Sequence, residues 1–277
     1  MWTRTSPVLS RRRLGARLKR LRERRRMSVE EAAPKLDVSR ATLHRIETGG
    51  GADVHFVRSA MDLYDSYEED LLELARAGRR RGWWKIYDVH DQGYIGMETE
   101  AVEVCEFQLS HLPGLLQTES YMRTLFEANN ARWTEAEVAN NIIVRKRRQD
   151  RLTDAEAPLR LTAVLDEAVL RRPIGGVEVM REQLWYLLER AELPTVSLQV
   201  IPFGPLPHPG MDGTFIILRF AQDEDPDLLY QESVTGSVQT EKPRQLRAAK
   251  LAFDRLRSEA LPPQESATFI AEVAAQL

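Results

Sequence analysis

The chain has 277 residues, of which 43% are hydrophobic and 29% are charged. The hydrophobic content is sufficient for packed cores, and the length favours two domains over one, because a domain commonly has about 100–200 residues. No apolar segment approaches the roughly 18 residues of a membrane helix, and none follows the basic N-terminus as in a secretory signal, so we expect a cytoplasmic protein.

The net charge of −3 divides unevenly along the chain. Residues 1–82 contain 19 basic and 12 acidic side chains, a net charge of +7, whereas residues 83–277 carry −10. A segment this basic is typical of a phosphate-binding domain, although a solvated or disordered tail has a similar composition. The single cysteine, Cys105, excludes an internal disulfide and a thiolate metal site, and we expect neither a metal nor a cofactor.

Two helices are predicted at the start of the chain. The first covers about Arg12–Arg25, where one apolar stripe is formed by Leu14, Leu18 and Leu21. The second begins after Ser28, because Ser28 and Glu31 have the spacing of a capping box. Pro34 lies inside this second helix and is expected to kink or shorten it.

A short third helix is predicted at Arg40–Glu47, between the cap residue Ser39 and Gly49. Two helices joined by a three- or four-residue turn form a helix-turn-helix, whose second helix enters the major groove of DNA. We predict that Arg40 and Arg45 read bases, because a guanidinium can donate two hydrogen bonds to guanine. The remaining predicted DNA contacts, at phosphates or on the same outward face, are Ser28, Ser39, Ala41, Thr42 and His44. The alternative is a solvated helix face that contacts no DNA, because such a face has the same composition.

Two more helices complete the predicted five-helix domain of residues 1–82. They cover about Asp53–Tyr64 and Ser66–Ala77, and Ser66 with Glu69 repeats the capping-box spacing. The basic run at residues 78–82 is either a linker or a phosphate contact. Trp83 and Trp84 follow it at a domain edge, and we expect them to pack an interdomain seam, the alternative being a ligand contact.

Residues 14–49 resemble the helix-turn-helix of the phage-repressor or Xre type. The resemblance is carried by Val38-Ser39, Thr42-Leu43 and Arg45-Ile46-Glu47 followed by Gly49. In that family an arginine of the first helix forms a buried ion pair with the glutamate that ends the recognition helix, which implies a pair between Arg22 and Glu47 here. The chain departs from the family pattern at Val29, where a phosphate-binding glutamine is common, and at His44, where serine is usual.

The remaining residues, 83–277, alternate between helical and strand patterns. Helices are predicted at about Glu98–Phe107, Glu119–Glu127, Thr134–Leu152, Val177–Glu192, Pro243–Arg257 and Gln264–Gln276. Strands are predicted at Leu159–Leu165, Thr195–Ile201, Phe215–Phe220 and Leu228–Gln231. The fold class is therefore α+β: an all-α domain followed by a mixed domain with a small sheet of about four strands covered by helices.

No catalytic motif is recognisable in the second domain. The polar residues beside its apolar segments are His111, Arg148, Glu167, His208 and Glu232, and their spacing fits no phosphate loop, nucleophile elbow or dinucleotide fingerprint. We therefore expect a protein that is not an enzyme. The alternative is that residues 83–277 act as an enzyme or sensor on a nucleotide-type small molecule.

A second resemblance covers almost the whole chain. It is carried by Gly82-Trp83-Trp84, Leu112–Thr118 followed by Tyr121, Arg147-Arg148-Gln149, Asp166-Glu167-Ala168 and His208-Pro209-Gly210. These motifs are similar to those of actinobacterial Xre regulators with a large C-terminal domain of unknown function, which are described as antitoxin-like transcription factors encoded beside a small partner protein.

This resemblance implies a sequence-specific transcription regulator bound to double-stranded DNA at the nucleoid. Residues 83–277 would then bind the small protein encoded by the adjacent gene, or another ligand, and so control DNA binding. A homodimer is expected, because a single helix-turn-helix offers a small footprint and paired half-sites multiply the affinity.

Overall fold

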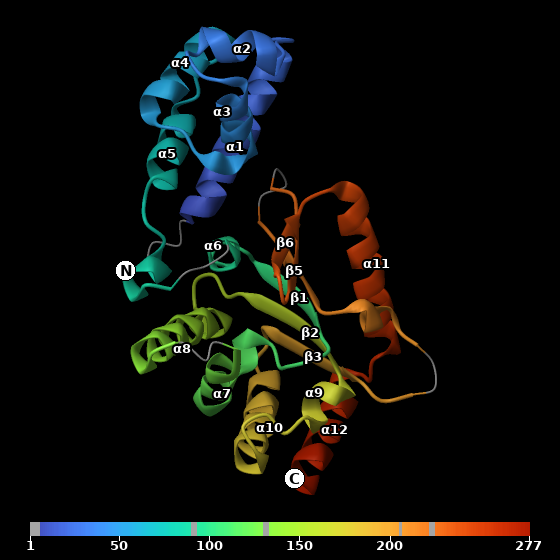
Figure 1. The fold of residues 1–277 in the computed structure, drawn as a ribbon. Helices are drawn as coiled ribbons and strands as arrows, with labels where there is room; N and C mark the ends of the chain where they lie inside the picture. The colour runs from blue at the N-terminus through green and yellow to red at the C-terminus, as the bar shows by residue number, and fades with distance from the viewer. Residues whose placement is uncertain (1–5, 90–92, 130–132, 205–206, 222–224) are drawn as a thin grey trace. The chain divides into compact units, whose positions relative to one another are not determined.

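The computed structural model describes residues 6–89, 93–129, 133–204, 207–221 and 225–277. They fold into two compact units, here called unit 1 (Met1–Ile86 with His90–Glu100) and unit 2 (Tyr87–Val89 with Ala101–Leu277). Unit 1 is built from helices and unit 2 from helices around one sheet (Figure 1). In the described part of the chain, no helix combines the length and the apolar character needed to cross a bilayer.

Unit 1 contains the helix-turn-helix. In the descriptions below, η denotes a short 3-10 or π turn. The elements of unit 1 are α1 (Pro7–Arg24), α2 (Val29–Lys35), α3 (Arg40–Arg45), η1 (Ile46–Gly50), α4 (Val54–Tyr64), α5 (Glu69–Gly78), η2 (Trp83–Tyr87) and α6 (Tyr94–Glu98). Leu14, Leu18 and Leu21 of α1 are buried in one core with side chains of α2, α3, α4 and α5. The apolar stripe predicted for the first helix is confirmed, and each such buried leucine contributes about 1.5–3 kcal/mol.

The first helix is longer than the sequence pattern predicts. It begins at Pro7 and not near Arg12, because Ser6 acts as its N-cap: the Leu9 N–H donates to Ser6 Oγ at 3.2 Å. Proline is favoured at the first position of a helix, where its missing N–H would have no partner. The signal for this start was therefore present in the sequence as Ser6-Pro7.

The predicted capping box of Ser66 and Glu69 is wrong. Helix α5 begins at Glu69, and its N-cap residue Glu68 makes no side-chain capping hydrogen bond. Ser66 instead belongs to the end of α4, where its N–H donates to the carbonyl oxygen of Met61 at 3.0 Å. Asp65 takes a left-handed conformation (φ 49°) at this end. The Ser66 N–H, which a capping box would pair with the Glu69 side chain, therefore closes the end of α4 instead.

The tryptophans after the basic run pack inside unit 1. Trp83 Nε1 donates to Thr99 Oγ1 at 3.1 Å, and the ring of Trp84, which is 3% exposed, lies against Gly96 of α6. Unit 1 therefore continues beyond Gly82 to Ile86 and, after Tyr87–Val89 of unit 2, also includes the segment that ends at Glu100.

Unit 2 contains one mixed sheet in the order β3-β2-β1-β4-β5-β6. Its strands are β1 (Glu103–Gln108), β2 (Arg160–Asp166), β3 (Val196–Ile201), β4 (Phe215–Arg219), β5 (Leu228–Ser233) and β6 (Gly236–Thr240). Strands β1, β2 and β3 run parallel, and β4, β5 and β6 continue the sheet in antiparallel pairs. In the middle of the sheet, Val104 of β1 pairs with Leu161 of β2 on one side and with Leu218 of β4 on the other.

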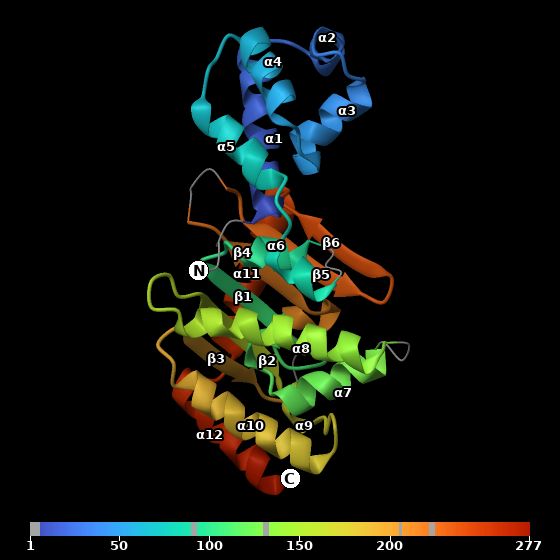
Figure 2. The same ribbon diagram turned by 90° about the vertical axis from the view of Figure 1, so that its left-hand side faces the viewer.

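Helices cover both faces of this sheet. They are α7 (Glu119–Asn129), α8 (Glu135–Gln149), α9 (Glu167–Arg171), α10 (Val177–Ala191), α11 (Pro243–Glu259) and α12 (Pro263–Gln276). Helix α11 packs on one face, where Leu246, Phe253 and Leu256 join the core of Cys105 and Phe107. Helices α7, α8 and α10 lie on the opposite face, in front of the sheet in Figure 2.

The α+β class is confirmed, but the sheet has six strands where about four were predicted. The segment Glu98–Phe107 was predicted as a helix, but its second half, from Glu103, belongs to the central strand β1. Its backbone pairs with β2 on one side and β4 on the other, and these partners are distant in sequence. The polar edge strand β6 was not predicted at all, because Gly236–Thr240 has neither apolar alternation nor a buried side chain.

Candidate nucleic-acid interface

Serine side chains cap the starts of α2 and α3. Ser28 and Glu31 form the predicted capping box, in which the Ser28 N–H donates to the Glu31 carboxylate at 2.8 Å and the Glu31 N–H donates to Ser28 Oγ at 3.2 Å. Ser39 caps α3 by accepting the Thr42 N–H at 3.0 Å. Each cap fixes where its helix begins, and thereby sets which side chains of α3 face outward.

Helix α3 has one buried and one exposed face. Leu43 and Ile46 are 1% and 4% exposed and join the core of unit 1. Thr42 is half-buried, and the predicted DNA-contacting residues Arg40, Ala41, His44 and Arg45 are exposed. The structure therefore places these four side chains where a nucleic acid could reach them.

The two arginines predicted to read bases differ in their surroundings. Arg40 lies 3.7 Å from Glu30, with both side chains more than half exposed, and such a surface pair holds a side chain weakly. Arg45 turns back on the chain after α3, where its Nη1 donates to the carbonyl oxygen of Gly50 at 2.9 Å. Arg40 is therefore exposed and only weakly held, whereas Arg45 is held at the end of its helix.

A buried ion pair joins α1 to the end of the recognition helix. Arg22 Nε donates to Glu47 Oε1 at 2.6 Å and Arg22 Nη2 donates to Glu47 Oε2 at 2.7 Å, with side chains 7% and 3% exposed. A third bond runs from Arg22 Nη1 to the carbonyl oxygen of Met27 at 2.7 Å. The hydrogen bonds to Glu47 raise the pKa of Arg22, against the opposing effect of burial. The structure thus brings together the pair that the family resemblance implied.

Helix α1 also approaches the turn η1 closely. A Cβ atom added at Gly15 would lie 2.9 Å from the carbonyl oxygen of Glu47, closer than such atoms approach in proteins. Within η1, Gly49 has a φ of 95°, which side chains rarely tolerate. Two glycines and the Arg22–Glu47 pair therefore fix the position of α3 on α1.

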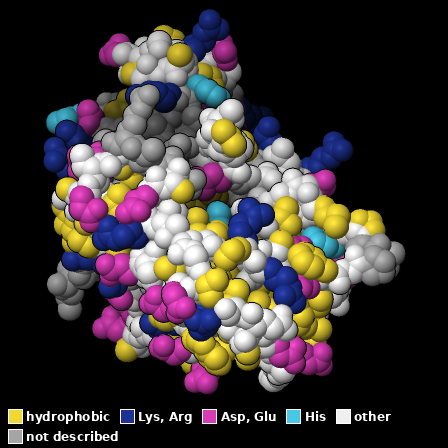
Figure 3. Space-filling view, turned by 60° about the horizontal axis from the view of Figure 1, so that its bottom comes forward, with side chains coloured by type: hydrophobic (Ala, Val, Ile, Leu, Met, Phe, Trp, Pro, Cys, Tyr) yellow, Lys and Arg dark blue, Asp and Glu magenta, His cyan; other side chains and the backbone are white. Residues whose placement is uncertain are grey.

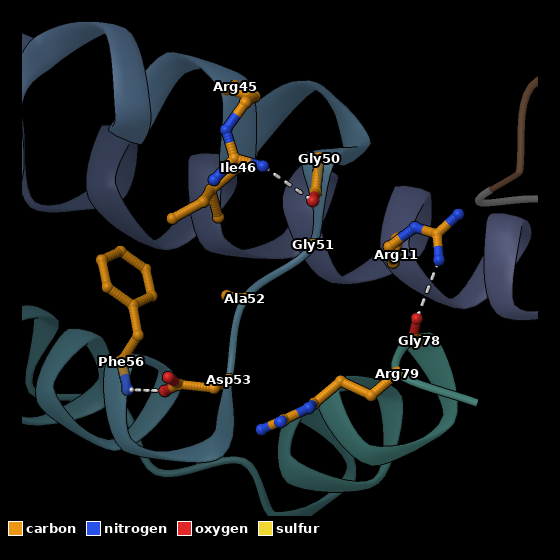
Figure 4. A pocket seen from close by; sticks show the side chains of 10 residues that line it. All are labelled: Arg11, Arg45, Ile46, Gly50, Gly51, Ala52, Asp53, Phe56, Gly78 and Arg79. Atoms are coloured by element: carbon orange, nitrogen blue, oxygen red, sulfur yellow. Dashed lines mark hydrogen bonds between the residues drawn. The ribbon is translucent and has the colours of Figure 1, made fainter. Parts of the chain in front are cut away.

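A pocket of about 540 Å³ opens beside the end of α3 (Figure 4). It is lined by Arg11, Arg45, Ile46, Gly50, Gly51, Ala52, Asp53, Phe56, Gly78 and Arg79. Sequence reasoning did not select Arg11 or Arg79 as site residues. The available signal was their position in two basic runs, Arg11–Arg13 and Arg79–Arg81, but nothing local shows that these runs meet.

The polar residues noted in the second domain have structural contacts. His208 Nε2 lies 3.1 Å from Asp166 Oδ2, and its Nδ1 accepts the Gly210 N–H at 3.2 Å, so both ring nitrogens are engaged. Glu167 accepts the Phe203 N–H at 2.6 Å and also bonds Arg171. Burial lowers the pKa of His111, which favours its neutral ring. Among the described residues, no three His, Cys, Asp or Glu side chains are grouped to hold a metal ion.

Two known domain families match this chain. Residues 13–75 match the family described as a helix-turn-helix domain, which spans α2 and α3 and is typical of DNA-binding regulators. Residues 92–272, well over half of the chain, match the family described as a domain of unknown function, DUF5753. Neither the curated proteins nor the solved structures provide a match.

Proposed function

We propose that this chain, which belongs to the DUF5753 family and carries a helix-turn-helix domain, is a sequence-specific transcription regulator that binds double-stranded DNA through α3. The observation that carries the proposal is the exposed face of α3, which presents Arg40, Ala41 and His44 on a helix fixed by the buried Arg22–Glu47 pair. A recognition helix needs this combination, because base readout requires exposed hydrogen-bond donors on a rigid support.

The phosphate contacts in this proposal come from the helix N-termini. The starts of α2 and α3, at Ser28 and Ser39, are exposed, and Thr42 lies one turn into α3. Backbone N–H groups at such ends attract phosphate oxygens and set the register of a protein on the duplex. We place this activity in the cytoplasm, at the nucleoid.

Control by a partner is the second part of the proposal. The motifs quoted above between residues 82 and 210 support an antitoxin-like regulator of actinobacterial type. Residues 83–277 carry a net charge of −10, which suits a small basic partner protein. On the face drawn in Figure 3 the acidic side chains form several groups with basic and hydrophobic side chains between them, so we propose that this face offers a partner a mixed surface and not one acidic patch.

We propose binding, not catalysis, for residues 83–277. The engagement of both ring nitrogens of His208 favours this choice, because a general base needs a free nitrogen. Partner or ligand binding would alter DNA affinity through different contacts in two states, and a homodimer would pair two recognition helices on half-sites.

The test of DNA reading is Arg40→Ala in the full chain. Binding to a randomised pool of duplexes, followed by sequencing, is expected to show a relaxed preference at one base position and a loss of about 1–3 kcal/mol on the preferred sequence. The matched control is Arg76→Ala on α5, an exposed arginine outside α3, which should leave the preference unchanged. An identical preference in Arg40→Ala and wild type contradicts the proposed readout.

The test of partner control is co-expression with the product of the adjacent gene. We expect the two proteins to elute together, and we expect the DNA affinity of the complex to differ from that of the chain alone. Separate elution contradicts the partner assignment while leaving DNA binding untouched.

A further inference from the structure

The pocket beside α3 collects three arginines from separate elements. Arg11 comes from α1, Arg45 ends α3, and Arg79 follows α5, and Figure 4 shows them around one opening. Two of them are held by backbone carbonyls, because Arg11 Nη1 donates to Gly78 and Arg45 Nη1 donates to Gly50, each at 2.9 Å. These bonds fix the guanidinium groups in the pocket wall and leave other N–H groups of each available.

In the described part of the chain these three cations have no carboxylate partner, whereas five other arginines of unit 1 have one. The paired arginines are Arg13 with Glu100, Arg17 with Glu68 and Asp70, Arg22 with Glu47, Arg25 with Asp65, and Arg40 with Glu30. Within the described part of the chain, neither Arg11 nor Arg45 nor Arg79 forms an ion pair. The single acid in the lining, Asp53, caps α4 by accepting the Phe56 N–H at 2.8 Å. The pocket therefore has a surplus of positive charge.

We propose that this pocket binds a phosphate group and that, through Arg45, its occupancy is coupled to the recognition helix; the coupling rests on the proposed DNA-binding function. Guanidinium groups suit this ligand, because their paired N–H groups match the spacing of phosphate oxygens. The phosphate belongs either to a phosphorylated small molecule or to the backbone of a bound duplex. Both sources present the same chemistry to the three arginines.

The size and walls of the pocket fit a ligand larger than a phosphate ion. Its volume of about 540 Å³ lies in the range of about 300–1,000 Å³ that small-molecule sites occupy. Phe56 and Ile46 supply an apolar part of the lining, with Ile46 beside Arg45 and Phe56 on the side away from Arg11 (Figure 4). A phosphorylated molecule with an aromatic part would use both the arginines and this apolar part.

Arg45 connects the pocket to base reading. It is the last residue of α3, and its guanidinium cannot hold a ligand in the pocket and contact a base edge at the same time. A ligand that retains Arg45 in the pocket therefore lowers DNA affinity, and DNA lowers ligand affinity by the same factor.

The first experiment uses phenyl phosphate as the probe, with the isotope-labelled full chain at constant ionic strength. The amide signals of Gly50, Gly51, Ala52 and Gly78 are expected to shift saturably in wild type. The double variant Arg11→Gln, Arg79→Gln should raise the apparent dissociation constant at least tenfold. Its matched control, Arg58→Gln with Arg76→Gln, removes the same charge from exposed arginines outside the lining and should behave as wild type.

The second experiment distinguishes the sources of the phosphate by duplex binding at several salt concentrations. If the backbone of DNA occupies the pocket, the Arg11/Arg79 variant loses duplex affinity relative to its control, and its salt slope falls by about 1–2. If a free ligand occupies it, both variants bind duplex equally, and phenyl phosphate weakens duplex binding of wild type but not of the Arg11/Arg79 variant.

The phosphate site is overturned if the Arg11/Arg79 variant and its control are alike in both experiments. Failure of the proposed function has a different signature: wild type would bind no duplex at any salt concentration while phenyl phosphate still shifted the pocket signals. That result keeps the site and removes its coupling to DNA.

Discussion

At the scale of single residues, the Arg22–Glu47 pair carries the most consequence for the proposed function. Both charged groups are buried, and the pair joins α1 to the turn directly after α3. Removing one partner leaves the other charge buried without compensation, which costs far more than the loss of a surface pair. The orientation of α3 therefore depends on two side chains that are buried in unit 1 and lie outside α3.

We expect Glu47→Ala to lower the free energy of unfolding of unit 1 by about 3–5 kcal/mol, because it leaves the Arg22 guanidinium unpaired in the core. Hydrogen exchange of peptides from α1 and α4 in the full chain would measure this loss. The control is Glu23→Ala, which removes an exposed partner 3.8 Å from Lys19 and should change stability by less than about 0.5 kcal/mol. Equal protection in the two variants would disprove a stabilising role for the buried pair.

At the scale of elements, the contact between α1 and η1 sets the geometry of the helix-turn-helix. Gly15 allows the two segments to approach, because any side chain there would press on the backbone of Ile46 and Glu47. A glycine inside a helix normally weakens it, so its presence at this point reflects packing and not helix formation.

Whether Gly15→Ala raises or lowers the free energy of unfolding distinguishes the helix preference of the residue from its packing against η1. In an uncrowded helix the substitution would stabilise by about 0.5–1 kcal/mol. Here we expect destabilisation of about 1–3 kcal/mol, because the added methyl group forces α1 and η1 apart. Thermal unfolding, monitored through hydrogen exchange of α1, would measure this loss of stability. A displaced α3 should also weaken duplex binding. A gain in stability would show that the backbones have room to separate without cost.

At the scale of the whole molecule, each unit has a core of its own, and Cys105 reports on the core of unit 2. Its thiol is 2% exposed on β1, beneath α11. Burial raises the pKa of this thiol to about 12, with a smaller contribution from the nearby Glu103 carboxylate. Since the thiolate is the reactive form, the folded unit keeps this cysteine unreactive.

We therefore expect no reaction of the native chain with a thiol-specific disulfide reagent at pH 8, and stoichiometric reaction once guanidinium chloride unfolds unit 2. Absorbance of the thiolate released from the reagent measures the reaction in both states. The full reaction of the unfolded chain serves as the internal control, because it shows that the reagent is active and in excess. The labelling midpoint then gives the stability of unit 2 separately from that of unit 1. Rapid labelling of native protein would contradict the buried position of Cys105.

The parts of the fold that were predictable depend on neighbours in sequence. The leucine stripe of α1, the Ser28 and Ser39 caps and the outward face of α3 all follow from spacings of three or four residues. Even the early start of α1 was readable from Ser6-Pro7. Local patterns were sufficient here because a helix makes its hydrogen bonds within its own segment.

The sheet shows the opposite case. The acidic residues of Glu103–Gln108 obscure its strand pattern. It is nevertheless the centre of the sheet, because β2 and β4 supply its pairing partners from 57 and more positions away in the sequence. For the same reason β6 could be found only through its partner β5. Pairing between strands is a property of the tertiary structure, which overrides weak local preference.

The sequence by itself therefore determined that this chain has a basic helix-turn-helix domain followed by an acidic α+β domain, and which side chains of α3 face outward. Only the tertiary structure decided how many strands the sheet has and that Arg11 meets Gly78, 67 positions later. The physical reason is the range of the interactions: helices and caps are closed by near neighbours, whereas sheets and pockets are closed by distant segments that local spacing cannot relate.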